Sequence, residues 1–168
     1  MTLDEFLAAI EKKLPPIPSG ALEKFEAEIG QRLPEDYREF LIRCNGGYAR
    51  GYVQALDPKG LRPDACVNHI GGFRKENHFS LAWARLIYQS EEELRIPSAL
   101  LWIMDDPCGN AICVGISGEH RGQVFLWDHE LEPDPSEWDG SVATAGNIEL
   151  VADSFDYFVA GLQKVEEK

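Results

Sequence analysis

The chain has 168 residues, of which 44% are hydrophobic and 27% charged, and its formal net charge is −13. At about 150 residues per domain, this length predicts one domain over residues 1–168, and the composition excludes wholesale disorder and a fibrous repeat. No apolar run approaches the roughly 20 residues of a membrane-spanning helix and no basic-then-apolar leader opens the chain, so we expect a soluble, cytoplasmic protein that meets basic partners quickly and binds neither a membrane nor a nucleic acid directly.

Three helices are predicted in the N-terminal part, over residues 2–16, 19–30 and 34–47. Thr2 begins the first with capping-box spacing, Ser19 is the expected N-cap of the second, and proline and glycine pairs end the first and third. The apolar positions that repeat with helical spacing are Leu3, Phe6, Leu7, Ile10 and Leu14; Leu22, Phe25 and Ile29; and Tyr37, Phe40, Leu41 and Cys44.

The middle of the chain is less regular. Residues 51–56 and 67–70 suit short strands, and residues 57–60 carry turn chemistry between them. Residues 80–89 have the apolar spacing of a helix.

Three strands are predicted next, over residues 100–104, 111–116 and 123–128. The first is a continuous apolar run, which is typical of a strand buried on both faces, and the short turns between them predict an antiparallel meander.

The C-terminal part is predicted to be a surface loop followed by a helix. Residues 130–144 are acidic and rich in turn formers. Ser154 is the expected N-cap of a last helix, and residues 165–168 are expected to fray. The helix would bury Phe155, Phe158, Val159, Leu162 and Val165.

The sequence gives little support for a metal site or for disulfide bonds. His69, His78, His120 and His129 lack the short spacings of zinc sites. The cysteines form no C-x-x-C pair, so we expect reduced thiols that serve as small core residues, and no metal or cofactor. They are Cys44, Cys66, Cys108 and Cys113.

A catalytic hypothesis rests on Asp105 and Asp106, which follow a predicted strand. Paired carboxylates at such a place can act as acid and base, with His120 facing either acid across the hairpin. An Asp-Asp-Pro turn explains the same residues more simply, since short Asp side chains accept hydrogen bonds from nearby backbone N–H groups. No nucleophile elbow or phosphate-binding loop is present, so a hydrolase is only the third hypothesis.

Aromatic side chains among acids indicate a protein-binding surface. Trp102 and Trp127 lie within strands and are expected in the core, whereas Tyr48, Tyr52 and Trp138 lie in predicted surface segments. We expect a partner to contact two aromatic anchors and five acids: Tyr48, Trp138, Asp105, Asp106, Glu119, Asp128 and Glu130.

Five motifs in order resemble the SUKH superfamily. They are the G-x-x-LP-x-DY-x-x-FL pattern at residues 30–41, the Asn-Gly-Gly turn at 45–47, a GN-x-I-C strand entry at 109–113, a strand at 124–130 similar to V-Y-x-W-D-H-E and an A-x-SF-x-x-F helix at 152–158. The similarity covers residues 19–162.

The resemblance implies an α+β domain, with N-terminal helices and a C-terminal helix packed around a mainly antiparallel sheet. It also implies a non-enzymatic function. Bacterial members are typically immunity proteins that neutralise toxins, often nucleases, and a fungal relative regulates cell-wall synthesis through many partners. The expectation is therefore an immunity protein whose acids meet a basic toxin, with an intracellular scaffold or regulator as the alternative. The sequence leaves the oligomeric state open.

Overall fold

The computed structural model describes residues 1–54, 64–74, 79–90 and 94–165. The elements of these residues are α1 (Leu3–Ala9), α2 (Ala21–Ile29), α3 (Glu35–Arg43), β1 (Gly47–Gln54), β2 (Ala65–Ile70), α4 (Leu81–Tyr88), β3 (Leu100–Asp105), β4 (Ala111–Gly115), η1 (Gly118–His120), β5 (Val124–Trp127), η2 (His129–Leu131), β6 (Ile148–Ala152), α5 (Phe155–Gly161) and β7 (Gln163–Lys164). The predicted turn at 57–60, the last two residues of the predicted strand at 51–56, and His78 lie outside the described residues.

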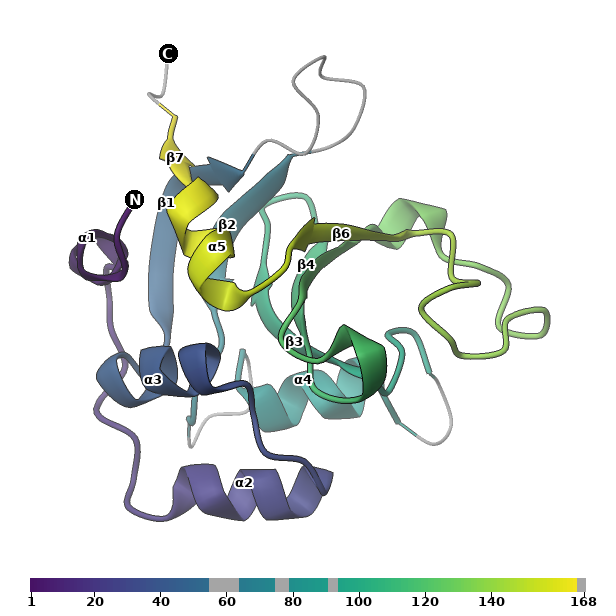
Figure 1. Cartoon of the computed structure of the whole chain (residues 1–168), viewed down its shortest axis with the longest axis horizontal. Helices are drawn as coiled ribbons and strands as arrows, with labels where there is room; N and C mark the ends of the chain where they lie inside the picture. Colours follow the sequence, from purple (N-terminus) through teal and green to yellow (C-terminus); the bar gives the residue numbers. More distant parts are fainter. Residues whose placement is uncertain (55–63, 75–78, 91–93, 166–168) are drawn as a thin grey trace.

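The strands form one antiparallel sheet in the order β6-β5-β4-β3-β2-β1-β7, which confirms the predicted meander and the α+β fold class. Every residue of β4 and β5 is buried, as are the first five of β3, so these strands lie inside the molecule on both faces. The sheet curls, and Gln54 at the end of β1 donates a hydrogen bond to the carbonyl of Val151 in β6. Helix α5 lies beside these two strands (Figure 1).

An aromatic cluster joins the helices α1, α3 and α5. The ring of Phe40 lies 5.9 Å from that of Phe6 and 5.0 Å from that of Phe155. Tyr37 contacts Phe155 at 5.2 Å, and all four rings are fully buried. Most of the predicted apolar faces of these helices are thereby confirmed as core, and Trp102 and Trp127 are buried as expected. Val165, predicted to be buried by the last helix, is instead 50% exposed because α5 ends at Gly161, and Leu3 and Leu14 are only partly buried.

Two motif residues tie distant segments together. The Asp36 carboxylate accepts hydrogen bonds from its own neighbour Tyr37 and, with its other oxygen, from the backbone N–H groups of Phe155 and Asp156. It thus caps the start of α5, where Ser154 also accepts from Tyr157. Asn45 donates to the carbonyls of Pro15 and Phe73 and accepts from the backbone of Phe73, so it links three segments.

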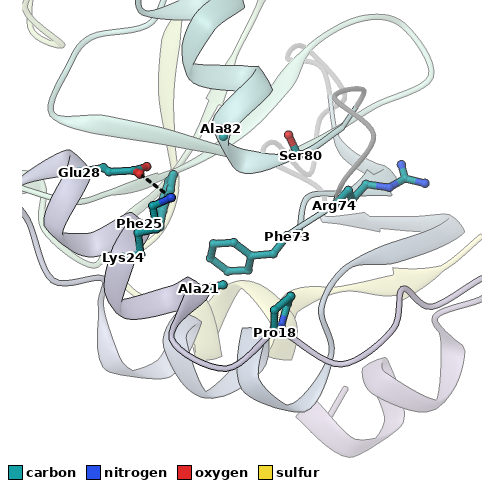
Figure 2. Close-up of a pocket in the computed structure, with 10 residues that line it drawn as sticks. Pro18, Ala21, Lys24, Phe25, Glu28, Phe73, Arg74, Ser80 and Ala82 are labelled. Atoms are coloured by element: carbon teal, nitrogen blue, oxygen red, sulfur yellow. Dashed lines mark ion pairs between the residues drawn. The ribbon is translucent and has the colours of Figure 1, made fainter.

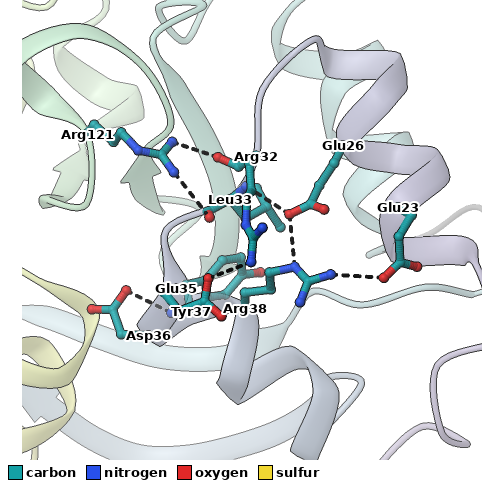
Figure 3. Close-up of polar contacts among 9 residues, drawn as sticks. All are labelled: Glu23, Glu26, Arg32, Leu33, Glu35, Asp36, Tyr37, Arg38 and Arg121. Carbon is teal, nitrogen blue, oxygen red and sulfur yellow. Dashed lines mark hydrogen bonds and ion pairs between the residues drawn. The ribbon is translucent and has the colours of Figure 1, made fainter.

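A second junction holds the connection between α2 and α3 (Figure 3). Glu26 accepts from the backbone of Leu33 at 3.0 Å and from the guanidinium of Arg38 at 3.1 Å. Arg121, just after η1, donates to the carbonyls of Arg32 and Leu33 from the other side. The junction therefore fixes this connection to the β4–β5 turn.

Several predicted boundaries are wrong at their ends. Helix α1 stops at Ala9 rather than at the prolines, because Glu11 pairs its backbone with Tyr48 of β1. Gly20, not Ser19, is the N-cap of α2.

At the other end of the chain, α5 ends at Gly161, and the next residues form β7 on the edge of β1. Val165, expected to fray, donates to the carbonyl of Gly51. Strands β6 and β7 had no counterpart in the predicted elements.

Candidate protein-binding surface

A long acidic loop connects β5 to β6. This acidic loop, residues 128–147, carries six acids and no lysine or arginine. It projects on the side of the molecule opposite α1 (Figure 1). The acids are Asp128, Glu130, Glu132, Asp134, Glu137 and Asp139.

The two ends of the acidic loop are joined by hydrogen bonds. Asp128 donates its backbone N–H to the carbonyl of Asn147 at 2.9 Å, and the Asn147 side chain donates to the carbonyl of Asp128 at 2.8 Å. Glu132 forms an ion pair with Arg95, whose guanidinium lies 5.3 Å from the centroid of the buried Trp127 ring. The loop is therefore anchored to the core at its base.

Local turns order the rest of the acidic loop. Asp134 accepts from the backbone and hydroxyl of Ser136, and these bonds hold the pKa of Asp134 below its ordinary value of 3.8. Asp139 accepts from Thr144 and Ser141, which lower its pKa in the same way. Both carboxylates stay charged under mildly acidic conditions, so the loop carries fixed negative charge.

The predicted contact residues divide between the two ends of the sheet. Tyr48 begins β1, Asp105 ends β3, and both Asp128 and Glu130 follow β5, so antiparallel pairing places all four at one end. Glu119, 89% exposed, lies in η1 at the opposite end, because η1 connects β4 to β5 on that side. The predicted contact residues therefore do not form one compact patch. The acids of the acidic loop are the group that lies together.

Trp138 lies half-buried within the acidic loop. Its indole N–H donates to the carbonyl of Ser141 at 3.0 Å, and its backbone N–H donates to Asp134. The ring is held in a defined position with part of its surface open, as an anchor for a partner requires. Tyr52, in contrast, is buried, because β1 continues through it and its ring meets Phe6; the prediction that it is a surface residue is wrong.

Asp105 pairs with a histidine that the sequence analysis did not select. His69 of β2 donates its backbone N–H to Asp105 at 2.8 Å, and its Nδ1 lies 3.1 Å from the same carboxylate. Burial raises the pKa of Asp105 above 3.8, and the contacts with His69 oppose that rise in part. His120, the expected partner of the acids, instead packs its ring against Phe125 and lies in η1 at the opposite end of the sheet.

Asp106 is 6% exposed and forms the turn between β3 and β4. Its carboxylate accepts from the backbone N–H groups of Cys108 and Asn110 and from the Asn110 side chain, all within 3.0 Å. Asn110 in turn accepts from the backbone of His129. Asp106 therefore holds the turn in place and does not offer its carboxylate to a partner.

The described residues contain no group of three or more His, Cys, Asp or Glu side chains arranged to hold a metal ion. Cys44 and Cys113 are buried free thiols, as expected, but Cys108 is exposed in the β3–β4 turn, which corrects its assignment to the core. Within the described part of the chain, no helix has the length and apolarity needed to cross a membrane.

An apolar groove lies between α2 and the start of α4 (Figure 2). Phe25 and Phe73 meet edge to face at 5.7 Å in its floor, and Pro18 lies beside them. The cavity measures about 260 Å³, and the ion pair between Lys24 and Glu28 borders it. No motif in the sequence pointed to this groove, because its two rings come from separate segments.

The residues that order the acidic loop were also missed. Arg95, Glu132 and Asn147 carry no motif, and only the folded chain brings them together. The two Asp-x-Ser sequences at 134–136 and 139–141 are a local signal that could have been used, because Asp side chains accept from the backbone two residues on.

Comparison with known proteins gives two matches. The model of the SMI1 / KNR4 family (SUKH-1) matches residues 16–161. A Bacillus subtilis (strain 168) protein, described as "SPbeta prophage-derived uncharacterized protein YokK", is 29% identical over an alignment that covers 84% of this chain and 72% of the relative.

Proposed function

Because the chain belongs to the SMI1 / KNR4 family (SUKH-1), whose members are commonly immunity proteins or regulators and generally not enzymes, we propose that it is a non-enzymatic immunity protein. It binds a cognate toxin in the cytoplasm and blocks it. The toxin is a basic protein, and a nuclease is the class that fits best. The Bacillus relative is described as prophage-derived, which supports a function in competition between genetic elements.

The observation that carries this proposal is the ordered acidic loop. A nuclease needs positive charge where it holds the phosphates of its substrate, and a fixed array of carboxylates is complementary to that charge. The loop is ordered before binding by its own hydrogen bonds and by the ion pair of Glu132 with Arg95, so little conformational entropy is lost on association. Trp138 supplies an aromatic anchor among the acids.

The test is co-expression with the toxic protein encoded beside this gene. We expect the chain to rescue growth and to co-purify with the toxin in a stoichiometric complex. Exposed charges at an interface chiefly set the association rate, so binding should slow as salt is added. Failure to bind the neighbouring product or to rescue any toxic domain would refute the proposal.

Two single variants separate the two ends of the sheet. Glu130→Gln removes a charge within the acidic loop, and Glu119→Gln removes an exposed charge at the opposite end of the sheet. We expect slower association with the toxin for Glu130→Gln and no change for Glu119→Gln. The reverse result would move the contact surface to the β4–β5 turn.

The alternative is a scaffold or regulator that uses the same surface. A pull-down distinguishes the two functions, because several signalling or envelope proteins would be captured in place of one toxin.

A further inference from the structure

The outer edge of β1 is covered at two separate places. On one side, Glu11 exchanges backbone hydrogen bonds with Tyr48 at 2.7 and 2.9 Å. On the other, β7 pairs with Tyr52 and Val53, and Val165 donates to Gly51 at 2.8 Å. Between these two covers, no further backbone pairing of this edge is present among the residues that the structure describes.

A hollow of about 760 Å³ lies between the two covers, and we call it the β1 hollow. Its wall includes backbone as well as side chains, because β1 bulges between Tyr48 and Tyr52, and Gly51 takes a left-handed conformation there (φ 79°). Such bulges re-aim side chains at the edge of a sheet. The residues that line the hollow are Glu11, Lys12, Tyr48, Arg50, Gly51, Lys164 and Val165.

The β1 hollow is positively charged in a strongly acidic chain. Lys12, Arg50 and Lys164 are all exposed, and Glu11 is the one acid among the described residues that line the hollow. None of the three cations has an ion-pair partner among the described residues. Other cations of the chain do have carboxylate partners, namely Lys24, Arg32, Arg38, Arg43 and Arg95.

Tyr48 organises two of these cations. The Lys12 ammonium lies 5.7 Å and the Arg50 guanidinium 5.5 Å from the centroid of its ring. The ring is itself held edge to face against His69 at 5.2 Å. The positive groups thus surround a fixed aromatic wall, an arrangement that suits an anion with some apolar surface.

We propose that the β1 hollow binds an acidic peptide segment of a protein partner, with carboxylates directed at Lys12, Arg50 and Lys164. Three cations spread around a hollow at a strand edge match several separate carboxylates better than one compact anion. A nucleic acid is disfavoured because its phosphates would continue beyond the hollow onto a chain of net charge −13. Strand β1, which lines the hollow, and the acidic loop lie on opposite sides of the molecule (Figure 1). This site therefore goes beyond the proposed function and does not depend on the toxin.

The experiment is a titration of the full-length, ¹⁵N-labelled protein with a terminally capped hexaglutamate peptide at low salt. We expect the amide resonances of Arg50, Gly51 and Lys164 to shift in a saturable way, and the shifts to weaken as salt is added. The double variant Arg50→Gln/Lys164→Gln should bind the peptide about three- to tenfold more weakly, given the usual size of exposed charge interactions.

The matched control is Lys24→Gln/Arg32→Gln, which removes the same amount of charge from two exposed cations outside the hollow. It should bind the peptide as the unmodified protein does, and the amide spectra of both variants report that each is folded. Equal weakening in both variants, or no saturable shift in the unmodified protein, would overturn the proposal. Tighter binding of a thymidine hexanucleotide than of hexaglutamate would overturn it in favour of a nucleic-acid site. None of these outcomes bears on rescue from a toxin, so the two proposals fail separately.

Discussion

The cap that Asp36 places on α5 makes a quantitative prediction about stability. In Asp36→Ala, the backbone N–H groups of Phe155 and Asp156 lose their acceptor, at distances of 2.8 and 3.3 Å. A hydrogen bond to a charged group contributes about 1.5–3 kcal/mol, and the longer of the two bonds contributes less. The charges of Asp36 and Asp156 repel each other, which offsets part of the gain, but Asp156 is largely exposed and the repulsion is screened.

The expected cost of Asp36→Ala is therefore about 2 kcal/mol, which lowers the melting temperature by about 4–8 °C in a chain of this size. Ser154→Ala removes one acceptor of the same helix and should cost about 1 kcal/mol. Asp36→Asn keeps one acceptor oxygen of the two that are used and should fall between Asp36→Ala and the unmodified protein.

The measurement is urea denaturation, supported by calorimetry, for all three variants. The reasoning would be refuted if Asp36→Ala cost less than Ser154→Ala, because the carboxylate would then contribute nothing beyond an ordinary cap. Equal stability of Asp36→Asn and the unmodified protein would show that only one of the two oxygens matters.

Three further outcomes follow from burial and close packing. Burial raises the pKa of Asp105 above 3.8, so between 3.8 and the raised value the folded state holds a proton that the unfolded state has released. The free energy of unfolding should therefore fall as pH rises through this range. Asp105→Asn should flatten this pH dependence in denaturation curves, and an unchanged slope would contradict the assignment. Iodoacetamide should label the exposed Cys108 first. Cys113 should react only when the chain unfolds, because it is buried and burial raises the pKa of its thiol. Peptide mass spectrometry would identify the labelled residues, and labelling of Cys113 in the native protein would argue against its burial. A Cβ at Gly72 would lie 1.9 Å from the Asn45 carbonyl oxygen, so Gly72→Ala should cost about 1–3 kcal/mol, and a melting temperature equal to that of the unmodified protein would show that this junction can move.

Elements with a dense local signal were predictable from the sequence. The capping box at Thr2, the apolar run of β3, the helical spacing of α4 and the cap of α5 at Ser154 are all present in the structure. Each depends on residues within one turn or one strand. The family resemblance, confirmed over residues 16–161, supplied the order of helices and sheet.

Features that depend on distant partners were not predictable. Strand β6 is only partly buried and carries Glu149, so its sequence lacks the apolar run of a central strand. The residues of β7 continue a helical pattern, but pairing with β1 takes precedence after Gly161.

The same limit applies to the candidate site. His69 reaches Asp105 across a strand pair, and Arg95 reaches Glu132 across 37 positions of sequence. The sequence shows how many acids the loop carries, but it does not show that hydrogen bonds and an ion pair hold them in fixed positions.

The bond between Asp36 and the start of α5 joins positions 119 residues apart. During synthesis, residue 155 must therefore have emerged from the ribosome before the first third of the chain can complete its contacts. The rings of Tyr37 and Phe40 stay without their Phe155 neighbour until then, which exposes nascent chains to chaperones and proteases. A stalled or nicked product that lacks the last helix should be cleared rather than accumulate as a stable fragment.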